Sequence, residues 1–146
     1  MTDTGSDSFT RHLRALLPPQ RETDVHSPLV LAYVGDAVFE LAVRAYLATH
    51  IRASVGELHE RARDKVRAAA QAQALADIEG SLTEEERELV RRARNAKAQV
   101  PKSASLYEYR YSTAFEALLG HLFLTGRLER LVHLLDLVIP RGETEA

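Results

Sequence analysis

The chain has 146 residues, no cysteine, and 19 Lys and Arg against 21 Asp and Glu, which gives a formal net charge of −2. This length fits one domain over residues 1–146, and the absence of cysteine excludes disulfides, thiolate metal sites and a cysteine nucleophile and favours the cytosol. No signal peptide or membrane-spanning helix is expected, because residues 1–8 are polar and carboxylates interrupt the apolar stretches.

Helical periodicity dominates the sequence, strand-like alternation is nearly absent, and glycine and proline fall between the periodic segments. We therefore expect an all-α fold of about seven helices. A short first helix is expected over residues 8–17, before two consecutive prolines. Ser27 can cap a second helix, with Pro28 at its first position, that runs to about His50.

Three later segments open with the capping-box spacing, in which a Ser or Thr and a Glu three residues on satisfy each other's backbone N–H groups. Each pair marks an expected helix start. The pairs are Ser54 with Glu57, Thr83 with Glu86, and Ser105 with Glu108. The expected boundaries between the later helices are Gly80 after residues 68–78, Val100-Pro101 after residues 83–96, and Gly126 before a last helix that ends before Pro140.

Two of the expected helices are apolar on nearly every face and yet carry acids. Over residues 29–43 the only charges are Asp36 and Glu40, which lie one helical turn apart on one face. Over residues 112–126 the only formal charge is Glu116. Such apolar helices are typical of helices surrounded by other helices, where an ionised carboxylate is costly unless a cation, hydrogen bonds or a metal compensates.

Side-by-side packing of these two helices would bring their acids together. Gly35 and Gly120 would permit close backbone approach beside the acids, so that two or three carboxylates would converge on one pocket. Convergent carboxylates repel one another. The usual resolutions are a shared proton, an arginine partner, or a hard cation such as Mg²⁺ held through oxygens.

Plainer interpretations of the same acids stay open. Asp36 and Glu116 can be buried, hydrogen-bonded structural acids, and Glu40 can form a helix-surface ion pair with Arg44. Several other chemistries lack their usual motifs. None of the six histidines has a Glu three residues before it, which excludes a di-iron carboxylate bundle. The phosphate-binding loop, the nucleophile elbow and the zinc-binding helix motif are absent too.

Residues 31–41, LAYVGDAVFEL, resemble the signature helix of ribonuclease III, and residues 115–120, FEALLG, resemble the second acidic motif of that family. The two motifs occur in the family's order. The resemblance covers roughly residues 29–135, and residues 1–7 and 141–146 are expected to be flexible ends. The similarity is closer still to the short bacterial branch, Mini-ribonuclease III, through the segments Glu57-Leu-His59, Arg94-Asn-Ala-Lys97, Pro101-Lys102 and residues 109–120.

This resemblance implies a dimeric helical endonuclease domain that cuts double-stranded RNA with Mg²⁺, for which Mn²⁺ can substitute, and leaves 5′-phosphate and 3′-hydroxyl ends. It implies Asp36 and Glu116 as the catalytic, metal-binding carboxylates. The implied substrate is the base-paired stem that flanks precursor 23S ribosomal RNA, so the process would be ribosomal RNA maturation, with a ribosomal protein as a candidate helper. A cytoplasmic homodimer without membrane contact is expected.

Three positions depart from the larger enzymes of the family, whose motifs usually carry acids where this chain has Leu29, Ala32 and Thr113. Fewer anionic ligands bind cations more weakly, which puts a full two-metal site in question. At least one Mg²⁺ per active centre remains the expectation. Glu40 is a candidate for an outer-shell role at the metal.

The resemblance does not extend to the double-stranded-RNA-binding domain of full-length ribonuclease III, so RNA affinity is expected to come from the helical domain. Two clusters of basic residues, which the net charge of the whole chain does not reveal, would bind the RNA backbone. Ordinary solvated helix faces are the alternative interpretation of both groups. The favoured RNA contacts are Arg91, Arg92, Arg94, Asn95, Lys97, Lys102 and Arg110, and the second group is Arg61, Arg63, Lys65 and Arg67.

Two other classes of protein stay open. A non-catalytic RNA-binding scaffold would keep the fold and lose cleavage, although it would have no reason to keep costly acids in two apolar helices. A structural helical interaction protein would bind neither RNA nor metal. A change in thermal stability or RNA binding on addition of Mg²⁺ would argue against the second class.

Overall fold

The computed structural model describes residues 11, 27–96, 100, 102 and 105–139. Over these residues the chain forms six α-helices, one short 3-10 helix and no strand, which confirms the predicted all-α class. The helix expected over residues 8–17, apart from Arg11, and both chain ends lie outside the described residues. The elements are α2 (Pro28–His50), α3 (Val55–Val66), α4 (Ala68–Ile78), η2 (Glu79–Ser81), α5 (Glu84–Arg94), α6 (Leu106–Leu124) and α7 (Leu128–Val138).

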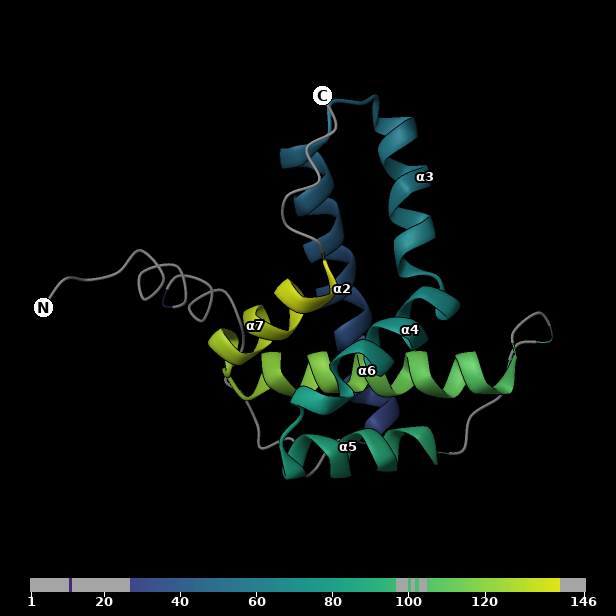
Figure 1. The fold of residues 1–146 in the computed structure, drawn as a ribbon, viewed down its shortest axis with the longest axis vertical. Helices are drawn as coiled ribbons and strands as arrows, with labels where there is room; N and C mark the ends of the chain where they lie inside the picture. The colour runs from purple at the N-terminus through teal and green to yellow at the C-terminus, as the bar shows by residue number, and fades with distance from the viewer. Residues whose placement is uncertain (1–10, 12–26, 97–99, 101, 103–104, 140–146) are drawn as a thin grey trace, which may run out of the picture.

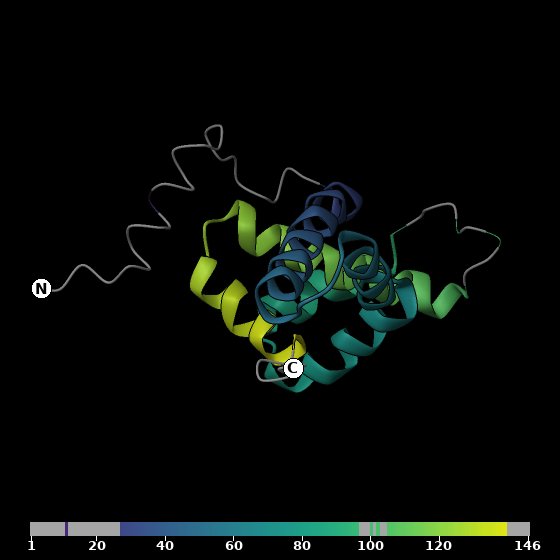
Figure 2. The same ribbon diagram turned by 90° about the horizontal axis from the view of Figure 1, so that it is seen from above.

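Helix α6 is the centre of the fold, and the other helices are arranged around it. Helix α2 crosses α6, and α4 and α7 pack against α6 and against each other (Figures 1 and 2). Helix α5 runs along α6 at the end of the molecule away from α3 (Figure 1). The second half of α2 and the antiparallel α3 project from this body as a helical pair, which we call the α2–α3 hairpin (Figure 1).

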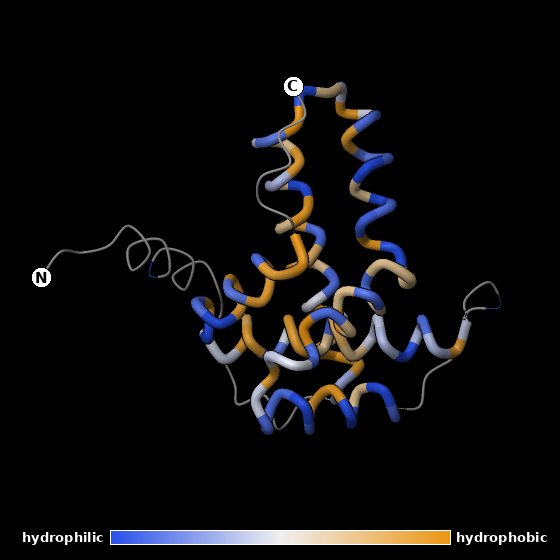
Figure 3. Tube along the Cα trace, in the orientation of Figure 1, coloured by the Kyte–Doolittle hydropathy of each residue, from blue (hydrophilic) through white to orange (hydrophobic). Residues whose placement is uncertain are grey.

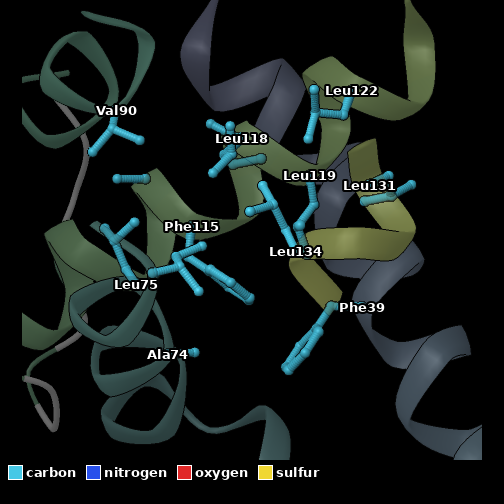
Figure 4. Packing of buried hydrophobic residues seen from close by; sticks show 14 of the residues in the cluster. Phe39, Ala74, Leu75, Val90, Phe115, Leu118, Leu119, Leu122, Leu131 and Leu134 are labelled. Carbon is cyan, nitrogen blue, oxygen red and sulfur yellow. The ribbon is translucent and has the colours of Figure 1, made fainter. Parts of the chain in front are cut away.

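The core gathers on α6, where Phe115, Leu118 and Leu122 are fully buried. Phe39 of α2 meets Phe115 edge-on, with ring centroids 5.1 Å apart, and Leu134 of α7 closes the same cluster (Figure 4). Burying each such side chain stabilises the fold by about 2 kcal/mol. Helices α3 and α5 are mainly hydrophilic and α7 mainly hydrophobic (Figure 3). None of the described helices is both long and apolar enough to cross a membrane.

The helix starts predicted from capping residues are confirmed. In each case a hydroxyl oxygen accepts a hydrogen bond from the backbone N–H three residues further on. At Thr83 the reciprocal bond is present as well, since the Thr83 N–H donates to the Glu86 carboxylate over 2.9 Å and completes a capping box. The four capping residues are Ser27, Ser54, Thr83 and Ser105.

The break between α3 and α4 has no proline or glycine to mark it in the sequence. Arg67 adopts an extended conformation there, with φ −64° and ψ 156°. The buried Gln71 side chain donates a 2.7 Å hydrogen bond to the Val66 carbonyl, which would otherwise lack a helical partner. This break turns the chain from the hairpin into the body. Later, Gly126 makes the turn into α7 with a φ of 72°, as its place in the sequence predicts.

A buried ion pair fastens α5 to α7. Arg130 donates hydrogen bonds of 2.7 and 3.0 Å to the buried Glu86 carboxylate and a third, of 2.6 Å, to the Ser81 carbonyl. Leaving such a carboxylate buried without its arginine costs about 3 kcal/mol. The pair therefore ties the start of α5 to α7.

Candidate active site

Helices α2 and α6 cross with their backbones in contact. A Cβ atom added to Gly35 would overlap the carbonyl oxygen of Glu116. A Cβ atom added to Gly120 would overlap the carbonyl oxygen of Leu31. Any larger residue at either glycine would push the helices apart. The close approach predicted from the two glycines is thus confirmed.

This crossing brings Asp36 and Glu116 together. Asp36 follows Gly35 directly on α2, and the charge of its carboxylate acts on the Glu116 carboxyl across the crossing. Asp36 is exposed and Glu116 is half-buried, so the pair lies at the rim of the crossing, open to solvent on one side. The alternative of a buried structural acid is therefore wrong for Asp36.

The carboxyl pair is electrostatically unfavourable when both groups are ionised. Burial, and after it the charge of Asp36, raise the pKa of Glu116 from 4.5 to about 8. In the metal-free protein, a pKa of about 8 keeps the Glu116 carboxyl mainly protonated at neutral pH. A divalent cation can displace that proton and relieve the same repulsion, and carboxylate oxygens are ligands that Mg²⁺ prefers. The donor set fits a hard cation held between Asp36 and Glu116.

Among the residues that the structure describes, no third acid joins this pair. Leu29 is half-buried and Ala32 is buried, and neither can ligate through its side chain. The buried Thr113 hydroxyl donates a 2.8 Å hydrogen bond to the Tyr109 carbonyl of its own helix. Within the described part of the chain, no group of three or more His, Cys, Asp or Glu could hold a metal ion.

Glu40 lies one turn beyond Asp36 on α2 and is paired with Arg44. The Arg44 Nε donates to the Glu40 Oε2 over 2.8 Å. The helix-surface ion pair predicted from the four-residue spacing is confirmed.

One face of α2 is covered by none of the described helices. Val30, Tyr33 and Leu41 are 45%, 81% and 69% exposed. The apolar sequence of α2 predicts a helix enclosed by its neighbours, whereas in the single chain the face that carries these three residues is exposed. The opposite face packs into the core through Leu31 and Phe39.

The two basic groups lie on different elements, the first on and after α5 and on α6, and the second on the last turns of α3 and at the break before α4. Lys97 lies outside the described residues. Arg91 is exposed and pairs with Glu88 over 2.6 Å. The other exposed members are Arg92, Asn95, Lys102, Arg110, Arg63 and Arg67, whereas Arg61 and Lys65 are half-buried.

Arg94 is held against α6 by a tyrosine that sequence reasoning did not single out. Its Nη1 donates a 2.9 Å hydrogen bond to the Tyr111 hydroxyl, and its guanidinium lies 5.2 Å from the centre of that ring. Tyr107 stacks on Tyr111 with centroids 4.2 Å apart. The four-residue spacing of the two tyrosines is visible in the sequence, but the contact with α5 is not. These contacts fix the end of α5 against the first half of α6.

Comparison with known proteins assigns this helical arrangement to a family. The model of the ribonuclease III domain family matches residues 29–127, from α2 through α6. The Mini-ribonuclease 3 of Thermoanaerobacter sp. is 45% identical over 77% of this chain and 80% of the relative. The chain belongs to the Mini-ribonuclease III branch of the ribonuclease III family. It is an endoribonuclease, as the resemblance of its motifs predicts.

Other relatives and a solved structure agree. The Mini-ribonuclease 3 of Symbiobacterium thermophilum is 47% identical over 80% of this chain and 92% of the relative, and that of Brevibacillus brevis is 39% identical over 85% and 95%. An X-ray crystal structure of a Fusobacterium nucleatum protein superposes with a TM-score of 0.74 at 31% identity, over 82% of this chain and 96% of that chain. The ribonuclease III-type helical fold is thereby confirmed.

The raised pKa of Glu116 predicts how the stability of the metal-free endoribonuclease depends on pH. A carboxyl with a folded pKa of about 8 and an unfolded value of 4.5 costs increasing stability as the pH rises from 4.5 through 8. Glu116→Gln removes this cost. In EDTA, the variant should match the wild type near pH 4 and exceed its free energy of unfolding by about 5 kcal/mol at pH 9. Denaturant unfolding at both pH values measures this.

Glu60 is an exposed acid on α3, so Glu60→Gln is the control for loss of a charge. If Glu116→Gln raised the free energy of unfolding by the same amount at both pH values, the prediction would be contradicted. Mg²⁺ at pH 8 should raise the melting temperature of the wild type and leave that of Glu116→Gln nearly unchanged, because a ligand that binds only the folded state stabilises it.

Proposed function

We propose that the protein is a Mg²⁺-dependent endoribonuclease that cuts both strands of double-stranded RNA, in the maturation of the ends of precursor 23S ribosomal RNA. The observation that carries the proposal is the pair of carboxyls, Asp36 and Glu116, at the rim of the α2–α6 crossing. The proposed products carry 5′-phosphate and 3′-hydroxyl ends. The proposed compartment is the cytoplasm, and a ribosomal protein is a candidate helper on the natural substrate.

Asp36 and Glu116 would hold the cation through their carboxylate oxygens, one from each helix. The bound cation supplies a polarised water for in-line attack on the phosphodiester and positive charge for the leaving oxygen. Glu116 reaches the site from the half-buried side and Asp36 from the exposed side, where the RNA backbone has access. The Gly35–Gly120 contact sets the separation of the two helices and thereby of the two carboxylates. Mn²⁺, which also accepts oxygen ligands, should substitute.

The site would operate with few protein ligands. With Leu29, Ala32 and Thr113 in place of acids, the two carboxylates leave most of the coordination sphere of Mg²⁺ to water and to RNA oxygens. We therefore expect at least one Mg²⁺ per active centre, held more weakly than in a site with additional acids.

Backbone contacts to the RNA would come from exposed cations. Arg92, Lys102 and Arg110 are exposed around the end of α5 and the start of α6, where they are available to phosphates. Arg94 keeps one nitrogen on Tyr111, so we assign it a supporting place in this group. Arg63 and Arg67 offer a second contact region at the end of α3 and the break before α4. Recognition through phosphates and 2′-hydroxyls would be mainly by shape.

The open face of α2 supports a homodimer. Tyr33, Ala37 and Leu41 recur every four residues and form one exposed apolar stripe. The residues next to them, Asp36 and Glu40, form a parallel acidic stripe. A second copy that packed on the apolar stripe about a two-fold axis would cover it and would place two active centres beside each other. Each centre would then cut one strand.

Charge introduced into the apolar stripe tests the dimer. Tyr33→Arg and Leu41→Arg should each raise the dimer dissociation constant at least about tenfold, because a desolvated cation would face its own copy across the axis. Analytical ultracentrifugation over a range of protein concentrations measures this. Val132→Arg, at a half-exposed site on α7, is the matched control and should stay dimeric. Unchanged association of both α2 variants would place the interface elsewhere.

The proposed activity is tested with a labelled stem from the ends of precursor 23S ribosomal RNA, with Mg²⁺ or with EDTA. Cutting of both strands only with Mg²⁺, with 5′-phosphate products, supports the proposal. An unpaired RNA of the same sequence should stay intact. Tight binding of the stem without any cutting in Mg²⁺ or Mn²⁺ would favour the non-catalytic scaffold.

A further inference from the structure

The four-residue spacing of Asp36, Glu40 and Arg44 places them on one stripe of α2. Each step along the stripe is about 6 Å, so Arg44 lies about 12 Å from Asp36 along the helix axis. The stripe begins at the carboxyl pair and continues onto the α2–α3 hairpin (Figure 1). One RNA strand that passes over Asp36 and follows α2 therefore meets Arg44.

The Glu40–Arg44 pair leaves most of the guanidinium available. Only the Arg44 Nε is bonded to Glu40, over 2.8 Å, and no other described residue accepts a hydrogen bond from the Arg44 guanidinium. The Arg44 side chain is 59% exposed and that of Glu40 is 33% exposed. Because a guanidinium has five N–H donors in a rigid plane, fixing Nε orients the remaining four.

The ion pair between Glu40 and Arg44 adds little to the stability of the fold, because an exposed pair of this spacing contributes only about 0.4 kcal/mol. We infer that Arg44 binds a backbone phosphate of the RNA strand that is cut at Asp36 and Glu116, and that Glu40 is the positioning residue that orients its guanidinium. This deepens the proposed function and rests on it. Two parallel N–H donors match the oxygens of a phosphate.

The first test compares kcat/KM on an RNA duplex in Mg²⁺ for the wild type, Arg44→Ala and Arg44→Lys at several salt concentrations. Arg44→Ala should lower kcat/KM about tenfold or more, mainly through KM, because a charged hydrogen bond to the substrate is lost. The slope of log kcat/KM against log salt should become shallower by nearly one, as expected for one phosphate contact. Arg44→Lys should keep the slope and recover only part of the activity, since it has charge without the planar fork.

Arg87→Ala is the matched control, because Arg87 is an exposed arginine on α5, at the end of the molecule away from the hairpin (Figure 1). Its kcat/KM and salt slope should equal those of the wild type. Melting temperature and oligomeric state of every variant are measured alongside. Loss of activity in Arg44→Ala that accompanies dissociation or unfolding would overturn the inference.

The role of Glu40 is tested by the sign of its effect. A merely solvated carboxylate near RNA repels phosphate, so its removal would improve kcat/KM. A positioning carboxylate gives the opposite result, and Glu40→Ala should lower kcat/KM several-fold while the Mg²⁺ concentration for half-maximal rate stays unchanged. Improved activity overturns the inference. A raised Mg²⁺ requirement also overturns it, because it would place Glu40 in the outer shell of the metal.

Failure of this inference is distinguishable from failure of the proposed function. If Asp36→Asn abolishes cutting while Arg44→Ala keeps both kcat/KM and the salt slope, the endoribonuclease mechanism stands and the Arg44 contact is refuted. If Asp36→Asn cuts RNA as well as the wild type, the proposed active centre and the Arg44 inference are both refuted.

Discussion

Asp36→Asn is expected to lower kcat/KM for RNA cleavage by on the order of 10³-fold, which corresponds to about 4 kcal/mol of transition-state stabilisation. Asn keeps the size and one oxygen of Asp36 and removes the charge that holds the cation. Fold should be retained, because Asp36 is exposed and its main partner is Glu116. Single-turnover cleavage of a labelled duplex at saturating Mg²⁺ measures the loss, and circular dichroism checks the fold.

Asp77→Asn is the matched control for this change. Asp77 is an exposed acid on α4 that accepts a 2.8 Å hydrogen bond from Gln73, and Asn can still accept it. The cleavage rate of Asp77→Asn should be within about twofold of the wild-type rate, because substitutions at such surface sites usually have small effects. If Asp36→Asn keeps about a tenth or more of the wild-type rate, Asp36 is not part of the catalytic centre.

Gly35→Ala is expected to destabilise the fold by about 3 kcal/mol, or to prevent folding, although alanine is the better helix former. The new Cβ would overlap the Glu116 carbonyl, which is backbone and cannot rotate away. The helices would separate, and the melting temperature should fall by about 10 °C. Activity should fall as well, because the same crossing sets the distance between Asp36 and Glu116.

Gly56→Ala on α3 is the control, since the nearest atom to an added Cβ there is the Ser54 Oγ at 3.9 Å. This variant should be stabilised by about 0.5 kcal/mol, because the unfolded chain loses freedom and no clash arises. Gly120→Ala should behave like Gly35→Ala, through the Leu31 carbonyl. Equal stability of the Gly35 and Gly56 variants in urea titrations would show that the backbones do not touch.

Local sequence determined the helices because capping is a local interaction. A hydroxyl at Ser27 or Thr83 bonds an N–H only three residues away, so the helix starts could be read without knowledge of the fold. The break at Arg67 could not, since Gln71 reaches the Val66 carbonyl from the next helix. No residue type at the break itself disfavours a continuous helix.

For the site, the sequence determined the residue types and the two glycines that make the crossing possible. An acid in an apolar helix and a glycine beside it are visible in the order of residues, and so is the four-residue spacing of Glu40 and Arg44. The family resemblance added the roles of Asp36 and Glu116, which apolar context alone left open between a metal site and a structural acid.

Only the tertiary structure decided where these residues lie relative to solvent and to one another. Exposure of Asp36, burial of Glu116 and the raised pKa of Glu116 all depend on which side of the α2–α6 crossing faces solvent. The same holds for the uncovered stripe at Tyr33 and for the contact between Arg94 and Tyr111. Hydrophobic periodicity states which faces are apolar, but the hydrophobic effect is non-directional, so the packing of distant helices determines which of those faces are covered.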